Sequence, residues 1–317
     1  MTDQLLQRAA DLLRLVPDYP KPGILFWDIA PLLREPDVRK HAESLMAARW
    51  SNERIDVVAG FDARGFIFGK GIADLLNLPF EQIRKKGKLP GKTRAQKYEL
   101  EYGSAVQEVI DDGFLAGKRV LLVDDLLATG GTALCGAKLV EELGGEVVGI
   151  SVLTELPELG GHGILAEYKV HSLVTAVGTE KVIDAKYCVD MVVHDMHTGE
   201  VVLVERLNYP QGPATPGGHI EDESAIEAAT RELREEIGCT PQSVLYHSTL
   251  ADLDRDPRGP KISLVMSCLV DASTTIDEPG KTKVFKVPSL EQLPPDEDFV
   301  LKHGPSIRSV WAEKHLV

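Results

Sequence analysis

The chain has 317 residues, about twice the usual length of a domain, so two domains are the default expectation. Its content of 43% hydrophobic and 26% charged residues excludes a disordered or fibrous protein. Acidic side chains outnumber basic ones by 49 to 35, and the resulting net charge of -14 disfavours a nucleic-acid or anionic-membrane partner.

The N-terminal segment and the cysteines indicate a cytoplasmic protein. The first fifteen residues are polar and amphipathic, and no segment approaches the roughly 18 apolar residues of a membrane helix. The four cysteines are widely spaced and form no C-x-x-C pair, so neither a zinc site nor a redox centre is indicated. A reducing compartment is the simplest setting for such cysteines.

Between residue 55 and about residue 174, apolar strand-like runs alternate with helical segments. In chain order they read IDVVAGF, FGKGIADLL, RVLLVDD, TALCGAKLVEELGG and EVVGISVLT. This rhythm is typical of an α/β domain with a parallel sheet. The polar stretch 85–103 interrupts it and is predicted to be a long loop, of the kind that often serves as a lid.

The pattern changes around residues 177–185, which we take as the boundary between domains at 1–178 and 186–317. The next two apolar runs are separated by the short turn 197–199, as in an antiparallel hairpin. A single helix over 224–237 and further strand-like runs follow, so the second domain also combines helices with a sheet.

Residues 120–132, VLLVDDLLATGGT, predict a buried strand, two acids and a glycine-rich loop at the start of a helix. Unpaired N–H groups at such a helix start bind phosphate, and the hydroxyls of Thr129 and Thr132 add donors. Asp124 and Asp125 would repel phosphate but suit ribose hydroxyls and a divalent cation. The alternative is a sharp turn in which these residues act only as caps.

This run resembles the phosphoribosyl-diphosphate motif of type I phosphoribosyltransferases, in the form found in the adenine-specific family. Segments at 17–23, 61–66, 83–91 and 98–103 stand in the same order as in that family. The resemblance covers roughly residues 10–176, and it implies a parallel sheet flanked by helices and a homodimer.

The resemblance also implies roles for individual residues. Leu25 and Phe26 would hold the base, and Trp27, where the family usually has Arg, either fills the core or alters the base site. Glu101 would be the catalytic acid/base; the alternative is a solvated loop carboxylate. The implied phosphoribosyl-diphosphate ligands are Arg64, Arg84, Lys88, Asp124, Asp125, Ala128, Thr129, Gly130, Gly131 and Thr132, together with Mg²⁺.

In the predicted helix 224–237, Glu232, Glu235 and Glu236 fall at positions i, i+3 and i+4, which share one helix face. Like charges so arranged repel one another unless a cation offsets them, and carboxylate oxygens favour Mg²⁺ or Mn²⁺. The alternative is a solvated acidic face.

The stretch 217–239 resembles the Nudix box, G-x5-E-x7-R-E-U-x-E-E-x-G-U, where U is a bulky apolar residue. The resemblance implies an α/β/α sandwich with a mixed sheet and a metal-dependent diphosphate hydrolase. Glu232, Glu235 and Glu236 would bind the metal, Glu235 and Glu236 would be catalytic, and Arg231 and Glu223 would orient the helix.

Residues 254–259, DRDPRG, resemble a segment of the ADP-ribose pyrophosphatase branch, in which Arg255 and Arg258 would face the substrate. A plain Asp-Pro-Arg-Gly turn explains the same letters equally well.

These resemblances lead to the hypothesis of a bifunctional nucleotide-salvage enzyme that acts on small molecules. The first domain would make AMP from adenine and phosphoribosyl diphosphate, and the second would hydrolyse a nucleoside diphosphate derivative such as ADP-ribose, so both reactions would end in AMP. Alternatives are another substrate for the second domain, such as NADH or phosphoribosyl diphosphate, a second domain that only senses a nucleotide, or a first domain that serves as a transcription regulator.

Overall fold

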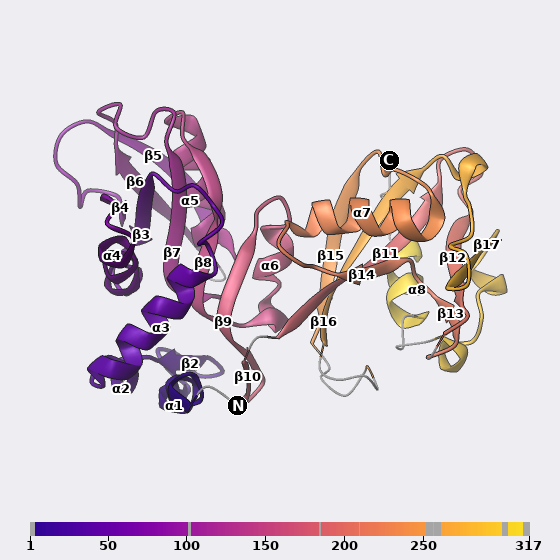
Figure 1. Ribbon diagram of the computed structural model, residues 1–317, viewed down its shortest axis with the longest axis horizontal. Helices are drawn as coiled ribbons and strands as arrows, with labels where there is room; N and C mark the ends of the chain where they lie inside the picture. The colour runs from indigo at the N-terminus through magenta and orange to yellow at the C-terminus, as the bar shows by residue number, and fades with distance from the viewer. Residues whose placement is uncertain are drawn as a thin grey trace. The chain divides into compact units, whose positions relative to one another are not determined.

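Two large sheets organise the described part of the chain, each with its own helices. The computed structural model describes residues 4–100, 103–183, 185–208, 210–251, 256, 261–299 and 304–312. The chain divides into unit 1, Met1–Asp184, and unit 2, Ala185–Val317; both are drawn in Figure 1. The sheet of unit 1 continues past the predicted domain end at residue 178, because a short strand at 180–183 pairs with the strand before it.

Unit 1 contains ten strands, six α-helices and a 3-10 turn within the described residues. Its strands are β1 Arg14–Pro17, β2 Leu25–Asp28, β3 Val57–Phe61, β4 Phe80–Lys85, β5 Thr93–Leu100, β6 Gly103–Ile110, β7 Arg119–Leu127, β8 Glu146–Glu155, β9 Val170–Val177 and β10 Glu180–Ile183. Its helices are α1 Gln4–Leu12, α2 Ala30–Leu33, α3 Pro36–Ala48, α4 Gly65–Leu76, α5 Gly131–Glu142 and α6 Gly161–Ile164, with η1 at Pro157–Leu159.

The main sheet of unit 1 has the strand order β10-β9-β8-β7-β3-β4-β6-β5, and β1 and β2 form a separate pair. Strands β4, β3, β7, β8 and β9 run parallel, which confirms the predicted parallel sheet. Helices α3 and α4 contribute to one apolar core cluster and α5 to another, so both faces of the sheet are covered. This explains why the central strands are apolar at nearly every position.

The polar stretch after β4 differs from its prediction as a long loop. Residues 93–100 form β5, which pairs with β6 in an antiparallel hairpin. The strand was missed because its exposed polar residues give no apolar alternation, so only backbone pairing defines it. The hairpin joins the main sheet through β6, which pairs with β4 at Arg84 and Lys85.

Unit 2 contains seven strands, two α-helices and three 3-10 turns within the described residues. Its strands are β11 Lys186–Asp195, β12 Val201–Arg206, β13 Gly212–Ala214, β14 Gly217–His219, β15 Val244–Leu250, β16 Lys261–Val270 and β17 Thr282–Val287. Its helices are α7 Ala225–Ile237 and α8 Gly304–Ala312, and its turns are η2 Ala272–Thr274, η3 Leu290–Gln292 and η4 Asp296–Asp298.

The sheet of unit 2 is mixed, as the sequence predicts. Strand β11 pairs in parallel with β16 and antiparallel with β12 and β14. Helices α7 and α8 pack on this sheet through different core residues, since the cluster that holds Ile307 and Val310 of α8 contains no residue of α7. These layers confirm the predicted class of both units (Figure 1). None of the described helices has the length and apolar character needed to span a membrane.

Helix α7 begins where the sequence predicts. Ser224 is its N-cap: the Ser224 hydroxyl accepts a hydrogen bond from the Glu227 N–H, and the Glu227 carboxylate accepts one from the Ser224 N–H. This capping box fixes the first turn of the helix. Gly238, with φ 74°, ends it in a left-handed conformation that glycine adopts without strain. Because both ends of α7 are fixed, the direction in which each of its acidic residues points is also fixed.

Candidate active sites

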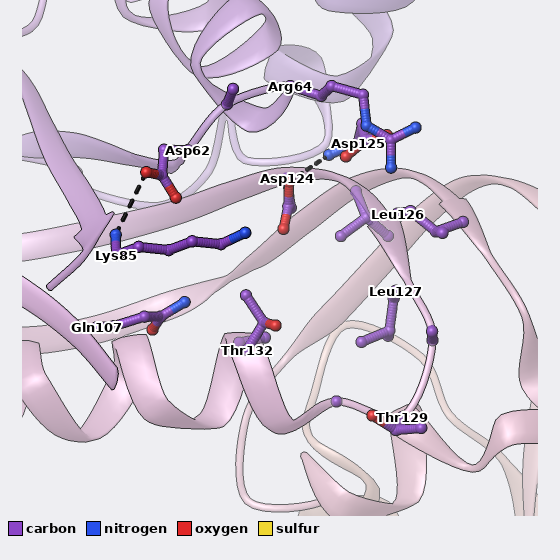
Figure 2. Close-up of a pocket in the computed structure, with 15 residues that line it drawn as sticks. Asp62, Arg64, Lys85, Gln107, Asp124, Asp125, Leu126, Leu127, Thr129 and Thr132 are labelled. Carbon is purple, nitrogen blue, oxygen red and sulfur yellow. Dashed lines mark hydrogen bonds and ion pairs between the residues drawn. The ribbon is translucent and has the colours of Figure 1, made fainter. Parts of the chain in front are cut away.

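A cavity of about 420 Å³ opens in unit 1 at the carboxyl ends of β3, β4 and β7. Ligands of open parallel sheets commonly bind at this edge. Its lining is Asp62, Ala63, Arg64, Lys85, Gln107, Asp124, Asp125, Leu126, Leu127, Ala128, Thr129, Gly130, Thr132, Ala133 and Val152 (Figure 2). The cavity thus brings together the predicted residues Arg64, Asp124 and Asp125 and most of the glycine-rich loop.

The glycine-rich loop 128–132 leads from β7 into α5. Gly130 has φ 82° and is the N-cap of α5, so the first N–H groups of that helix lack intrahelical partners. A Cβ on Gly130 would lie 2.8 Å from the carbonyl oxygen of Gly161, and one on Gly161 would clash with the carbonyl of Ala128. The loop therefore needs glycine on both sides of this contact, and its geometry suits a phosphate group.

Behind the loop lies a buried pair that the sequence did not indicate. The Nδ1 atom of His162 lies 3.2 Å from Oε1 of Glu155, and both side chains are almost fully buried. Glu155 ends β8 beside Leu127 in the sheet, and His162 belongs to the same turn as Gly161. The pair joins that turn to the end of β8, next to the start of the loop.

The two acids before the loop are close to each other and to a cation. The Asp125 N–H donates to Oδ1 of Asp124 at 2.9 Å, and the Asp125 carboxylate lies 3.0 Å from Nε of Arg64. Burial raises the pKa of Asp124 well above its usual range, and repulsion by Asp125 adds to this shift. Burial also raises the pKa of Asp125, against the opposing effect of Arg64. Two buried, adjacent carboxyl groups are suited to hydroxyl donors or to a cation.

Of the two predicted base-binding residues, Phe26 contacts Arg64. The Arg64 guanidinium lies 5.1 Å from the centre of the Phe26 ring, a cation–π contact, and the Tyr19 ring packs edge-on against the Phe26 ring with 5.0 Å between ring centres. Leu25 is 47% exposed. Trp27 is only 3% exposed and belongs to the core, so of the two interpretations for this residue the structure favours core filling. Its carbonyl accepts a hydrogen bond from Arg64 at 3.4 Å.

In the basic segment at the end of β4, the residue that lines the cavity is Lys85, whereas the sequence indicated Arg84 and Lys88. Successive strand residues point to opposite faces, so Lys85 lines the cavity whereas Arg84 does not. Arg84 donates to the carbonyl of Lys88 and lies over the Phe66 ring at 5.8 Å. Lys88 is exposed outside the cavity lining. The diphosphate roles of Arg84 and Lys88 remain predictions.

Eight lining residues were not among the predicted site residues: Asp62, Ala63, Lys85, Gln107, Leu126, Leu127, Ala133 and Val152. Asp62 and Ala63 share the strand-to-helix turn of Arg64, which was a usable signal. Lys85 follows Arg84 along a strand and so points to the opposite face, and this alternation was a second usable signal. Gln107 gave no local signal, because its place at the cavity depends on the pairing of β6 with β4.

In unit 2 the acidic face of α7 is organised by one arginine. Arg231 contacts Glu223 and Glu232, each at 2.6 Å, and donates to the carbonyl of His219 at 2.8 Å. Glu235 lies further away, at 3.7 Å, and is largely exposed. Arg231 and Glu223 thus stand where the sequence expects residues that orient the helix.

Glu236 is held apart from this arginine, against β14. Its Oε2 accepts a hydrogen bond from the Gly217 N–H at 2.9 Å. Burial raises the pKa of Glu236 to about 7, although that hydrogen bond opposes the shift, and repulsion by Glu232 adds to it. Glu232 packs against Gly218, where any Cβ would meet its carboxylate. Gly218 therefore leaves room for the Glu232 carboxylate, and Gly217 contacts Glu236 through its backbone N–H.

The donors on α7 fit a hard divalent cation in their chemistry. Burial raises the pKa of Glu232, against the opposing effect of Arg231, and raises that of Glu236 despite the hydrogen bond from Gly217, so the ionised form of Glu236 calls for further compensation. A bound Mg²⁺ would supply it. Over the described part of the chain, no three acidic, histidine or cysteine side chains already converge as metal ligands. Glu232 instead contacts Arg231.

Three predicted site residues lie outside the described residues. They are Glu101, Arg255 and Arg258. Their roles in acid/base catalysis and in substrate binding therefore remain predictions.

Comparison with known families assigns a class to each unit. Residues 30–182 match the phosphoribosyl transferase domain, and residues 185–310 match the NUDIX domain. The fold and cavity of unit 1 are thus those of a phosphoribosyltransferase, and unit 2 is a Nudix domain.

The relatives of unit 1 narrow its class to one family. The adenine phosphoribosyltransferase of Dinoroseobacter shibae is 51% identical over 170 residues, which are 53% of this chain and 95% of the relative. That of Cupriavidus metallidurans is 52% identical over 155 residues, 49% of this chain and 82% of the relative. Through unit 1, the chain belongs to the adenine phosphoribosyltransferase family.

A solved structure agrees with this assignment. The adenine phosphoribosyltransferase of Thermoanaerobacter pseudethanolicus has a TM-score of 0.53 and 44% identity, and it covers 54% of this chain and 99% of its own.

Proposed function

We propose that unit 1 transfers a phosphoribosyl group to adenine and releases diphosphate, which yields AMP. The observation that carries this proposal is the cavity itself, in which a glycine-rich helix start, an acidic pair and two cations line one space. The 51% identity to an adenine phosphoribosyltransferase supports the choice of reaction. A related structure from Saccharomyces cerevisiae, 35% identical with a TM-score of 0.50, is described as a complex with adenine, which supports the choice of base.

Each part of the cavity suits one part of the substrate. The N–H groups at the start of α5, with the hydroxyls of Thr129 and Thr132, would bind the 5-phosphate. Asp124 and Asp125 would accept hydrogen bonds from the ribose hydroxyls. Arg64 and Lys85 would hold the diphosphate, whose negative charge increases as it leaves.

A divalent cation also fits this cavity. The Oδ2 atom of Asp125 is buried and has no hydrogen-bond partner among the described residues, although Arg64 lies close by. Asp124 and Asp125 would hold Mg²⁺, which would neutralise part of the diphosphate charge.

A direct assay of the full chain tests the function of unit 1. We expect AMP from adenine and phosphoribosyl diphosphate, with hypoxanthine and guanine turned over at least about a hundredfold more slowly, because a site built to pair with one base rejects others. The Asp125→Asn variant should lose most of this activity. Equal turnover of the three bases would contradict the adenine assignment.

We propose that unit 2 hydrolyses a nucleoside diphosphate derivative in a metal-dependent reaction, with ADP-ribose as the first choice. Glu236 carries this proposal, since it is a buried carboxyl group placed beside a second one on the face of a Nudix helix. Glu232, Glu235 and Glu236 would hold the metal, which would activate water for attack on phosphorus. Cleavage of ADP-ribose would give AMP and ribose 5-phosphate, so both units would release AMP.

A product-resolved screen tests unit 2. ADP-ribose, NADH, diadenosine polyphosphates and phosphoribosyl diphosphate would be incubated with the full chain and Mg²⁺ or Mn²⁺, with Glu236→Gln as control. Hydrolysis of ADP-ribose by the wild type alone supports the proposal. Binding without hydrolysis of any compound would instead support the nucleotide-sensor alternative. Turnover only of compounds without adenylate would refute the proposal that both units release AMP.

A further inference from the structure

Gln107 lines the cavity of unit 1, although it belongs to neither the glycine-rich loop nor the acidic pair. The residue lies on β6 and is only 3% exposed. Its Oε1 atom is buried and has no hydrogen-bond partner among the described residues. Buried carboxamides in folded proteins are almost always hydrogen-bonded, so this one indicates that a ligand completes its contacts.

The pairing of the sheet places Gln107 beside a cation. In the antiparallel pair of β4 and β6, Gln107 stands opposite Lys85. Side chains of directly opposite residues project from the same face of a sheet, about 5 Å apart at Cβ. Both side chains reach into the cavity, on the side of Thr132 (Figure 2).

The chemistry of this wall fits a diphosphate. An ammonium group has three donors, so Lys85 is able to serve the carboxamide oxygen of Gln107 and a phosphoryl oxygen together. The amide NH₂ of Gln107 is then free to donate a hydrogen bond to the same phosphoryl group. A carboxamide adds no charge to a cavity that already holds three aspartates. A carboxylate at this position would repel the ligand.

We propose that Gln107 is a substrate-binding residue that acts with Lys85 to hold the diphosphate group of phosphoribosyl diphosphate. This assignment rests on the function proposed for unit 1. It makes the β5–β6 hairpin part of the binding site, because Gln107 is the residue through which the hairpin contacts the diphosphate.

The chain offers a matched control in Gln96. Gln96 is the cross-strand partner of Gln107 on β5, and its Oε1 is also buried without a partner among the described residues. It does not line the cavity. The Gln107→Met variant keeps the length of the side chain and removes the carboxamide, and Gln96→Met makes the same change one strand away.

The test uses the full chain with Glu236→Gln as the common background, so that unit 2 leaves the ligands intact. Titration calorimetry with inorganic diphosphate and Mg²⁺ should show Kd raised about tenfold in Gln107→Met, the size expected for one hydrogen bond to a charged group. We expect Gln107→Glu to weaken binding further. Kd for AMP, and both constants in Gln96→Met, should stay within about twofold of the background.

Kinetics provide a second readout. The KM for phosphoribosyl diphosphate should rise about tenfold in Gln107→Met, with the KM for adenine unchanged. Unchanged diphosphate affinity, an equal loss in Gln96→Met, or an equal loss of AMP affinity would each overturn the assignment. If Gln107→Met does not fold, Gln107→Asn, which withdraws the amide by one methylene, is expected to show the same split.

The two proposals fail in different ways. A wild-type chain that makes no AMP from adenine refutes the function proposed for unit 1, whereas the diphosphate titration still decides the role of Gln107. If the chain is active but its affinity for diphosphate is unchanged in Gln107→Met, only the role of Gln107 is refuted.

Discussion

The two candidate sites are built in opposite ways. The cavity of unit 1 collects residues from β3, β4, β6 and β7 and their turns, which are far apart in the sequence. The acidic site of unit 2 comes from one continuous stretch, with Glu232 and Glu236 of α7 packed against Gly217 and Gly218 just before it. The first site depends on how strands pair, and the second depends on the phase of one helix.

The sites also differ in what they offer a phosphate-containing ligand. Unit 1 presents backbone N–H groups and cations, so its loop is set for an anion. Unit 2 presents carboxyl groups, so a cation must come between the protein and its substrate. The activity of unit 1 should therefore depend most on backbone geometry, and the activity of unit 2 should depend most on side-chain charge.

The largest effect is expected from Glu236→Gln. This variant removes a carboxylate from the proposed metal site while it keeps the shape of the side chain. Hydrolysis by unit 2 should fall by a factor on the order of 10³, because the stabilisation of transition-state charge is lost. AMP formation by unit 1, measured in the same preparation, serves as the internal control and should not change.

The next largest effect concerns the backbone of unit 1. In Gly130→Ala the new Cβ would lie 2.8 Å from the Gly161 carbonyl at a φ of 82°, so the loop must shift. We expect kcat/KM for phosphoribosyl diphosphate to fall about a hundredfold, as small misplacements do in catalytic sites. Gly113→Ala is the matched control, since Gly113 has φ 84° with open space around its Cβ. If both variants keep full activity, backbone geometry does not limit unit 1.

A pH effect on stability is expected in unit 2. His194 is 5% exposed, and burial lowers its pKa from 6.5 to about 4. The folded state therefore keeps this ring neutral where the unfolded chain binds a proton, so stability falls as the pH drops below 6.5 and levels off near 4. Between pH 7 and pH 5 the loss should be roughly 2 kcal/mol.

Hydrogen exchange of β11 in the full chain, followed at both pH values with correction for intrinsic exchange rates, measures this loss. In His194→Gln the contribution of this residue to the pH dependence should disappear. A wild-type slope that the substitution leaves untouched would show that His194 is not the group responsible.

The smallest effect is expected from Arg231→Lys. Lysine keeps the charge but lacks the planar guanidinium that contacts Glu223, Glu232 and the His219 carbonyl together. Hydrolysis should fall about tenfold with a modest loss of stability, since one or two charged hydrogen bonds are lost. Arg234→Lys, at an arginine on the same helix that donates to Thr240, is the control. Equal losses in both variants would show that Arg231 has no special role.

Local patterns predicted the parts of the fold that local physics controls. The parallel sheet of unit 1 follows from alternating apolar strands and helices, and α7 starts at Ser224 as its cap residue requires. The phase of α7 also placed Glu232, Glu235 and Glu236 on one face.

Features that depend on contacts between distant segments were not predictable in this way. The register of β6 against β4 brings Gln107 to the cavity opposite Lys85, and no pattern near Gln107 encodes it. Likewise, the contact of Gly130 with Gly161 depends on how two turns meet. The hairpin strand at 93–100 was hidden because its pairing with β6, a contact between backbones, defines it.

The most direct test of two separate catalytic sites in one chain is a crossed assay of single variants. AMP formation from adenine with phosphoribosyl diphosphate, and from ADP-ribose, would be measured in the full-length wild type, in Asp125→Asn and in Glu236→Gln. We expect the wild type to carry out both reactions and each variant to lose only one: Asp125→Asn the transfer, and Glu236→Gln the hydrolysis. A wild type that lacks either reaction, or a variant that loses both together, would contradict this expectation.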